Sequence, residues 1–338
     1  MQQDDAITAA NFARYDATAS KGHYESFFLR ANHPTRPLAF WIRYTVFHPA
    51  AGGGAPIGEL WAVHFDGEEG SNVAVKREVG AEKCRFERTR FEVAIDDSAL
   101  AAGRAVGSAA SRGHRIRWDL AFDGDEPPLF LLPLRLYEAS LPKAKSLVAL
   151  PMARFRGTLD VDGRSVQIDD WTGSQNHNWG ERHTDQYAWG QVAGFDTHPG
   201  SFLEIGTARL RLGPLWTPFM TPLVLRHAGR EHALHTLAHL LRARASFEYF
   251  DWKFRAAGDD VRVHGRICAP RESFVGLTYL NPPGGTKHCL NSKLAACTLS
   301  VSVREGAAWS PPQTLSTQHR AAFEILTDDR GHGVPILV

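Results

Sequence analysis

The stretch that decides the fold is PLAFWIRYTVF, residues 37–47, where apolar side chains recur at every second position. A helix would place them three and four residues apart, so a period of two predicts a β-strand with one face in a core. The side chains on that face are Leu38, Phe40, Ile42, Tyr44 and Val46.

The same period continues along the chain. HRIRWDLAF (114–122) alternates in the same way, and TLDVDGRSVQID (158–169) predicts a hairpin that turns on Asp162-Gly163, a pair typical of type I′ turns. Residues 246–269 predict another hairpin, which turns near Gly258.

Few segments have a helical period. We expect helices only at 11–17 and 232–245. Two segments rich in small residues, 52–54 and 99–113, are expected to be loops.

The number of predicted strands indicates two domains. We expect about eight strands before residue 184 and about eight after it, which is the size of one antiparallel sandwich or barrel in each half. The sequence therefore predicts an all-β protein with a few short helices, divided into residues 1–184 and 185–338.

Composition excludes several classes of protein. The chain has 338 residues, with 38 Lys and Arg against 37 Asp and Glu, so no basic excess indicates a nucleic-acid partner. Its four cysteines form no CxxC pair, and the first residues lack an apolar signal segment. We therefore expect a reduced, cytoplasmic protein; its oligomeric state is left open.

The most unusual stretch is DDWTGSQNHNWGERHTDQYAWGQVAGF, residues 169–195. It combines three Trp with two His, two Asn and several carboxylates. Polar side chains among aromatic ones are costly to bury unless they bind each other or a ligand. One interpretation is a hydrated turn with Trp171 and Trp179 filling a domain boundary, and the other is a functional site.

Two segments resemble a known family. GSQNHNWG (173–180) and GHYESFFLRAN (22–32) are similar to motifs of the carotenoid 1,2-hydratase, tocopherol cyclase and AttH-like group. The resemblance implies two lipocalin-like domains in tandem and a cavity near their junction. It also implies hydration, cyclisation or pericyclic chemistry on greasy isoprenoid or polyketide substrates, with no metal or organic cofactor.

One position departs from the family pattern. His177, Trp179 and Gly180 match, but Asn176 stands where the family often has an acidic residue. An amide cannot donate a proton as an acid, so the acid must come from elsewhere if the chain protonates an alkene.

Carboxylates on the apolar side of a strand are the candidates for this acid, because burial raises the pKa of a carboxyl group. Glu204 is in phase with Phe202, Glu248 is in phase with Phe250 and Trp252, and Glu25 is in phase with Phe27. The alternative for each is a buried ion pair with an arginine of a neighbouring strand.

These considerations define a candidate site. The predicted catalytic residues are His177, Asn178, Glu204 and Glu248. The predicted substrate-binding residues are Glu25, Asn176, Trp179, Tyr187, Trp189, Gln191 and Trp252.

Other signals are weaker. His177 and His183 are six residues apart, but no third ligand or known zinc spacing accompanies them, so we expect no metal. Arg242 and Arg244 follow an apolar run, which leaves open a peripheral contact with a membrane that carries the substrate, but the net charge of +1 does not favour it.

Three functions remain open. The first is an enzyme that uses a buried acid, assisted by His177 and Asn178, to hydrate, dehydrate or cyclise a polyene-type substrate. The second is a non-catalytic carrier of a hydrophobic ligand. The third is a pericyclase, which needs hydrogen-bond donors but no strong acid. The surroundings of the three carboxylates discriminate among them.

Overall fold

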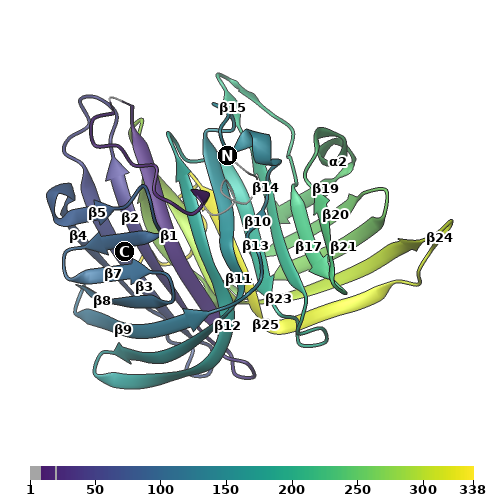
Figure 1. Ribbon diagram of the computed structural model, residues 1–338, viewed down its shortest axis with the longest axis horizontal. Helices are drawn as coiled ribbons and strands as arrows, with labels where there is room; N and C mark the ends of the chain where they lie inside the picture. Colours follow the sequence, from purple (N-terminus) through teal and green to yellow (C-terminus); the bar gives the residue numbers. More distant parts are fainter. Residues whose placement is uncertain (1–8, 20) are drawn as a thin grey trace.

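A computed structural model describes residues 9–19 and 21–338. Two large antiparallel sheets and very little helix make up these residues, which confirms the predicted all-β fold. Figure 1 shows the two halves side by side. The first sheet ends at Gly180 and the second begins at Gln186.

The first half is a sheet with the strand order β4-β3-β2-β1-β12-β11-β9-β8-β7-β6-β5, and β10 pairs with β11. It curls until β4 contacts β8 and β9. Its strands are β1 (His23–Asn32), β2 (Leu38–His48), β3 (Ile57–Asp66), β4 (Val73–Gly80), β5 (Cys84–Phe86), β6 (Glu92–Ile95), β7 (Ser98–Ala101), β8 (Arg104–Ser111), β9 (His114–Asp123), β10 (Leu129–Phe130), β11 (Ala144–Val161) and β12 (Arg164–Gly180). Short 3-10 turns lie at η1 (Ala81–Lys83) and η2 (Leu134–Leu136).

The second half has the order β18-β17-β14-β13-β25-β23-β21-β20-β19, with β22 and β24 paired to β23. Its strands are β13 (Gln186–Ala193), β14 (Phe202–Arg209), β17 (Leu223–His227), β18 (Arg230–Leu234), β19 (Arg244–Glu248), β20 (Asp251–Ala257), β21 (Val261–Cys268), β22 (Val275–Leu280), β23 (Thr286–Glu305), β24 (Ala308–Trp309) and β25 (Gln313–Thr327). A separate small hairpin joins β15 (Arg211–Leu212) and β16 (Leu215–Trp216), and the short helices are α2 (Leu237–Arg242) and η3 (Arg271–Ser273).

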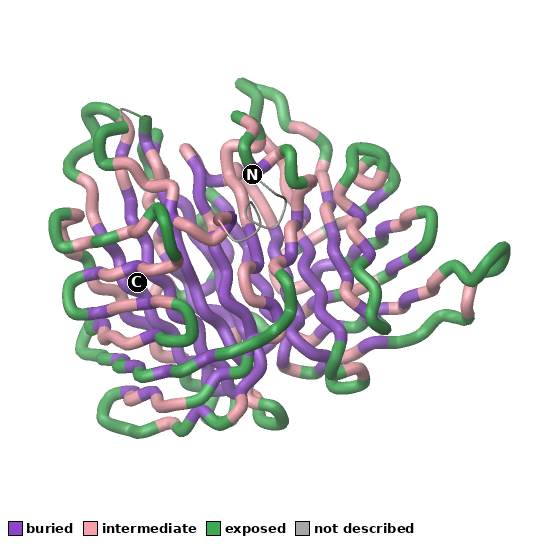
Figure 2. The backbone as a smooth tube through the Cα atoms, viewed as in Figure 1, coloured by how far each residue is buried: buried purple, intermediate pink, exposed green. Residues whose placement is uncertain are grey.

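The apolar side chains form three main layers. One cluster fills the first half and another fills the second, and both contain the alternating residues expected from the sequence. A third cluster lies between the halves, where Phe28 and Trp61 of the first half pack with Trp189 and Tyr279 of the second. As a result β1, β2 and β3 are buried on both faces, which is visible as long buried runs in Figure 2.

Two tight turns differ in whether the sequence predicted them. The β11–β12 hairpin turns on Asp162 and Gly163, both with positive φ, as the sequence predicted. A second tight turn at Tyr249 and Phe250, between β19 and β20, was not expected, and Phe250 has a φ of 76°.

Two of the expected segments are different in the structure. Residues 232–245 divide into the end of β18, the short helix α2 and the start of β19, so the predicted helix is wrong over most of its length. Residues 11–17 form turns and irregular structure, because their backbone amides bind a carboxylate described below.

The expected loop at 99–113 is also wrong, since it holds most of β7 and all of β8. Small side chains are needed in β8 because this strand packs against the indole of Trp118 on β9. A Cβ on Gly107 would come within 2.6 Å of the Trp118 indole. No helix in the described residues is long and apolar enough to cross a membrane.

The contact between β1 and β12 predicts a sensitive position at Gly173, where an added Cβ would lie 1.8 Å from the Arg30 carbonyl oxygen. Gly173→Ala should lower the free energy of unfolding in urea by at least about 2 kcal/mol. Gly200→Ala is the control, because nothing lies within 4 Å of its added Cβ, and equal losses in the two variants would contradict this prediction.

Candidate functional site

Strands β1 and β12 present two different faces. Phe27 pairs with His177 and both point into the first half, whereas Phe28 pairs with Asn176 on the face that meets the second half. His177 and Asn178 therefore point in opposite directions, because successive side chains alternate across a strand. The expectation that they act together is wrong.

The inner face carries a closed polar cluster around Glu25. His177 Nε2 donates to Glu25 Oε1 over 2.7 Å, and its ring stacks on Phe27 at 4.0 Å. The backbone amides of Arg14 and Tyr15 donate to the same carboxylate at 2.7–3.0 Å. Glu25 thus fastens the N-terminal segment over this end of the first half.

Protonation states show that Glu25 is not the acid. Burial raises its pKa, but hydrogen bonds from His177 and His23 outweigh burial and lower the pKa to about 2. Burial lowers the pKa of His177. Trp179 belongs to the same cluster, with the Arg14 guanidinium 3.8 Å above its ring. Glu25 and Trp179 are occupied by the protein's own N-terminal segment, so they do not line an open substrate site.

The outer face of the same strands meets β13 and β14 in a second polar cluster. Trp189 Nε1 donates to Glu204 Oε1 over 2.7 Å, and Gln191 Nε2 donates to Glu204 Oε2 over 2.9 Å. The same Gln191 amide donates to Asn176 Oδ1 at 2.9 Å. The structure therefore brings together four of the residues predicted for the site: Asn176, Trp189, Gln191 and Glu204.

Arg30 completes this cluster. Its guanidinium is fully buried and donates to Gln191 Oε1 at 2.9 Å and to Asn32 Oδ1 at 2.8 Å. Burial lowers the pKa of Arg30 to about 9, which still leaves it charged at neutral pH. Ser174 also donates to Gln191 Oε1 at 2.6 Å.

The Glu204 carboxyl has the protonation behaviour expected of a buried acid. Its pKa is raised to about 7 by burial, although the hydrogen bonds from Trp189 and Gln191 and the charge of Arg30 lower it. No Lys, Arg or His among the described residues lies within ion-pair distance of it. Near neutral pH a substantial fraction of Glu204 therefore carries a proton.

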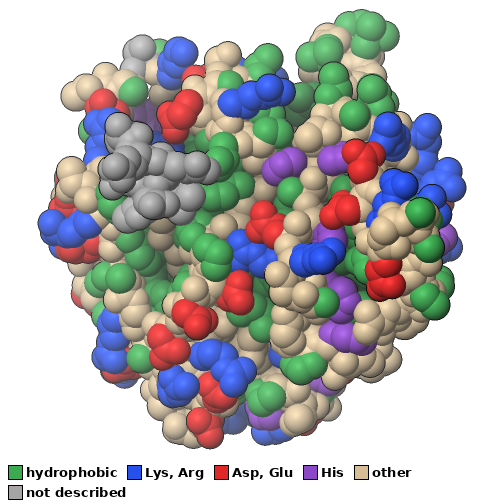
Figure 3. Space-filling model, turned by 45° about the vertical axis from the view of Figure 1, so that its right-hand side comes forward, with side chains coloured by type: hydrophobic (Ala, Val, Ile, Leu, Met, Phe, Trp, Pro, Cys, Tyr) green, Lys and Arg blue, Asp and Glu red, His purple; other side chains and the backbone are tan. Residues whose placement is uncertain are grey.

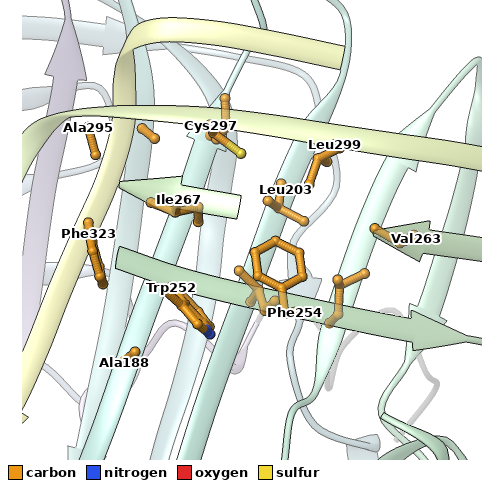
Figure 4. Close-up of a cluster of buried hydrophobic side chains, with 14 of the residues drawn as sticks. Ala188, Leu203, Trp252, Phe254, Val263, Ile267, Ala295, Cys297, Leu299 and Phe323 are labelled. Carbon is orange, nitrogen blue, oxygen red and sulfur yellow. The ribbon is translucent and has the colours of Figure 1, made fainter. Parts of the chain in front are cut away.

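Two predicted residues lie elsewhere. Glu248 is exposed at the end of β19, because the turn at Tyr249 and Phe250 reverses the chain and ends the alternation on which its prediction rested. Trp252 is buried inside the second half, next to Phe254 and Ile267, as Figure 4 shows. Its indole donates to Thr207 at 3.2 Å, on the face of β14 opposite Glu204.

Sequence reasoning missed several junction residues. Arg30 lies on the face of β1 opposite Glu25, and both faces of this strand are buried. Lys293 was not considered, yet it is fully buried and pairs with Glu324 at 2.7 Å beside Asn291. Strands buried on both faces give no periodicity by which such residues could be recognised.

A narrow cleft opens at the edge of the junction. It is lined by Tyr24, Arg43, Thr45, Glu59, His183 and Tyr279, among others. His183 stacks on Tyr24 at 4.0 Å, and the Arg43 guanidinium lies 4.4 Å from the Tyr279 ring centre. Tyr187 packs on the aromatic cluster between the halves, which contains both Tyr279 and Trp189.

Histidines are numerous but scattered. Figure 3 shows several of them at the surface on one face of the molecule. Within residues 9–19 and 21–338, no three His, Cys, Asp or Glu side chains gather as a metal-binding group. His183 Nε2 instead donates a hydrogen bond to the Leu280 carbonyl oxygen over 3.1 Å and so contacts the second half.

Sequence comparison finds relatives that match over nearly the whole chain. No family model matches the chain. Two uncharacterized proteins of Mycobacterium tuberculosis, Rv0493c of strain H37Rv and MT0513 of strain CDC 1551, are each 25% identical over 325 residues, which cover 94% of this chain and 90% of theirs.

Three solved structures share the architecture over nearly the whole chain. A candidate AttH protein of Nitrosomonas europaea superposes with a TM-score of 0.57 at 12% identity, covering 91% of this chain and 92% of its own. Kievitone hydratase of Nectria haematococca superposes with a TM-score of 0.55 at 12% sequence identity, and the match covers 91% of this chain and 89% of the hydratase. CghA, whose structure was solved with Sch210972, superposes with a TM-score of 0.54 at 9% sequence identity, and the match covers 90% of this chain and 88% of CghA. The tandem lipocalin-like fold implied by the two motifs is thereby confirmed.

We expect the Glu25 cluster to stabilise the fold by an amount that depends on pH. Glu25→Gln should lower the free energy of unfolding by about 3 kcal/mol at pH 7, because it removes a buried ionised acceptor of four donors. The folded pKa of about 2 lies below the ordinary 4.5, so this stabilisation is complete above pH 4.5 and is lost as the pH falls towards 2. Urea unfolding at pH 7 and pH 3 should show the difference shrinking, and a constant difference would refute the ionised state.

The Glu204 cluster predicts the opposite pH dependence. Its folded pKa of about 7 lies above the ordinary 4.5, so the neutral form is favoured by folding and stability falls as the pH rises from 4.5 to 7. Glu204→Gln mimics the neutral form. Relative to wild type, this variant should gain up to about 3 kcal/mol at pH 8 and nothing at pH 4. Equal stabilities of the two proteins at pH 8 would show that Glu204 ionises normally.

Proposed function

We propose that this protein is an enzyme that protonates a hydrophobic, polyene-type small molecule at the junction of its two halves, with Glu204 as the proton donor. The observation that carries this proposal is a fully buried carboxyl group with a pKa raised to about 7 and no ion-pair partner among the described residues. Glu204 is the one predicted acid that meets these conditions.

The chemistry follows from the groups around Glu204. Its O–H bond breaks, the proton joins one carbon of an alkene, and a carbocation and a carboxylate remain. Trp189 and Gln191 already donate to the two carboxyl oxygens, and Arg30 stabilises the new negative charge through Gln191. Addition of water to the carbocation, with return of one proton to the Glu204 carboxylate, gives hydration. Loss of a proton from a neighbouring carbon to that carboxylate gives isomerisation. Attack by a second alkene closes a ring and moves the positive charge, and loss of a proton from the new carbocation completes cyclisation.

The departure at Asn176 supports this assignment. Asn176 stands where the family resemblance places an acid, and the Gln191 amide joins it to Glu204 through two hydrogen bonds of 2.9 Å. A carboxyl group is thus present in the same cluster, supplied by β14. Support from the solved structures is indirect: kievitone hydratase is a hydratase by name, and the CghA structure contains Sch210972.

A second function has its own supporting observation. Asn176, Gln191 and Arg30 are hydrogen-bond donors at the junction that need no proton transfer. A pericyclase or a carrier of a hydrophobic ligand would use such donors to orient a bound molecule. In either case Glu204 would serve only as a structural acceptor.

Conversion assays distinguish these functions. Turnover can be followed by mass spectrometry with a lipid extract of the native host as the source of substrate. Glu204→Gln should reduce this turnover by at least about 100-fold. The wild-type rate should fall as the pH rises above 7, because the acid loses its proton. Glu248→Gln is the matched control and should keep the wild-type rate, since Glu248 is exposed. Full activity of Glu204→Gln would exclude acid catalysis by this residue and favour a pericyclase.

A further inference from the structure

The exposed apolar side chains of the described residues gather in three short segments. These segments are the loop that follows β10, the hairpin of β15 and β16, and the helix α2. Residues 131–145, 209–216 and 237–244 are together called the apolar end of the molecule. Its exposed large hydrophobic side chains are Leu134, Leu141, Leu212, Leu215, Trp216, Leu237 and Leu241.

Packing contacts join the three segments at one corner of the second half. Leu131 packs in one cluster with Ala233, a few residues before α2. Phe219, which follows β16, makes an edge-on contact with Phe247 of β19, the strand that follows α2, at a ring-centre distance of 5.4 Å. Figure 1 shows β15 and α2 along the same upper edge, and in Figure 3 hydrophobic side chains cover the highest point of the molecule.

The hairpin of β15 and β16 projects with two leucines at its tip. Within the described residues its strands pair only with each other, as a separate two-stranded sheet that turns at Gly213 and Pro214. Leu212 and Leu215 are 64% and 70% exposed, so they add little to the core. An isolated hairpin is only marginally stable in water, and exposed apolar patches typically mark a surface that meets another partner.

Basic residues surround these leucines. The apolar end has seven Lys and Arg and one acidic residue, Glu138, although the whole chain has 38 against 37. The exposed basic residues are Arg135, Arg211, Arg242 and Arg244. Three acidic residues just outside the apolar end, Glu181, Asp185 and Asp259, contact its basic residues but leave an excess of positive charge. The net charge of +1 thus conceals a local basic surface.

Projecting apolar side chains within a basic surface match the headgroups and acyl chains of an anionic membrane. We propose that the apolar end docks on a bilayer that contains anionic phospholipid, with Leu212, Leu215 and Trp216 inserted at the headgroup level. A second copy of this chain fits less well, because a twofold interface would place the same basic residues against each other. Docking does not depend on the chemistry at Glu204, so the two proposals can fail independently.

Cosedimentation with vesicles tests the docking. Wild type should bind vesicles of phosphatidylcholine with about one third phosphatidylglycerol at least about tenfold more strongly than vesicles of phosphatidylcholine alone. High salt should weaken this binding because it screens the surface charge. The double variant Leu212→Ser, Leu215→Ser should bind at least about tenfold more weakly and keep the wild-type melting temperature, since both side chains are exposed.

A pair of charge variants shows which surface is used. Arg135→Gln with Arg242→Gln removes two exposed charges from the apolar end and should weaken binding by about tenfold. Arg115→Gln with Arg117→Gln is the matched control, because it removes two exposed charges from β9 in the other half. The control should bind as wild type does.

Trp216 reports the orientation on the membrane, because it is the one exposed tryptophan among the described residues. Phospholipid that carries bromine in the upper part of its acyl chains quenches an indole that touches it. Part of the wild-type fluorescence should be quenched, and Trp216→Phe should lose most of this quenching when enough vesicles are present to bind both proteins.

Three results would overturn the proposal. They are equal binding of wild type to both kinds of vesicle, wild-type binding by the double leucine variant, and weakened binding by the β9 control. Self-association in sedimentation velocity that the leucine variant abolishes, without vesicle binding by wild type, would also overturn it, since the leucines would then contact a second copy of the chain.

Discussion

The structure depends on satisfying the buried polar groups at the junction of its two halves. Arg30 lies on a strand of the first half and has no exposed surface, yet its donors are met by Gln191 of the second half and by Asn32. A buried guanidinium without acceptors would cost several kcal/mol, so the two sheets are held in one relative position. This position brings Glu204 of β14 opposite Asn176 of β12.

The same pair of strands, β1 and β12, separates two carboxyl groups of opposite character. Glu25, on the inner face, has a pKa of about 2 because histidine and backbone donors surround it. The pKa of Glu204, against the outer face, is about 7 because burial outweighs two donors. The difference lies in the number and charge of the groups that face each carboxyl. It is consistent with an anchoring role for Glu25 and with the proton donation that we propose for Glu204.

Because the two faces of β12 differ in this way, residues of the motif around His177 have different roles. The motif lies on β12, and alternate residues of this strand face the junction. His177 and Trp179 point the other way and hold the N-terminal segment together with Glu25. A motif on a strand that is buried on both faces thus serves two purposes, one structural and one at the proposed site.

The sequence by itself determined the all-β class, most of the long strands and the Asp162-Gly163 turn, because a period of two and turn chemistry are local properties. Tertiary structure alone decided which face of each strand meets the other half, since both faces of β1 and of the second part of β12 are buried. It also removed Glu248 from the site through a turn with no strong local signal. The role of Arg30 became visible only when its partners Gln191 and Asn32 were known, because the cost of a buried charge depends on neighbours that can be distant in the chain.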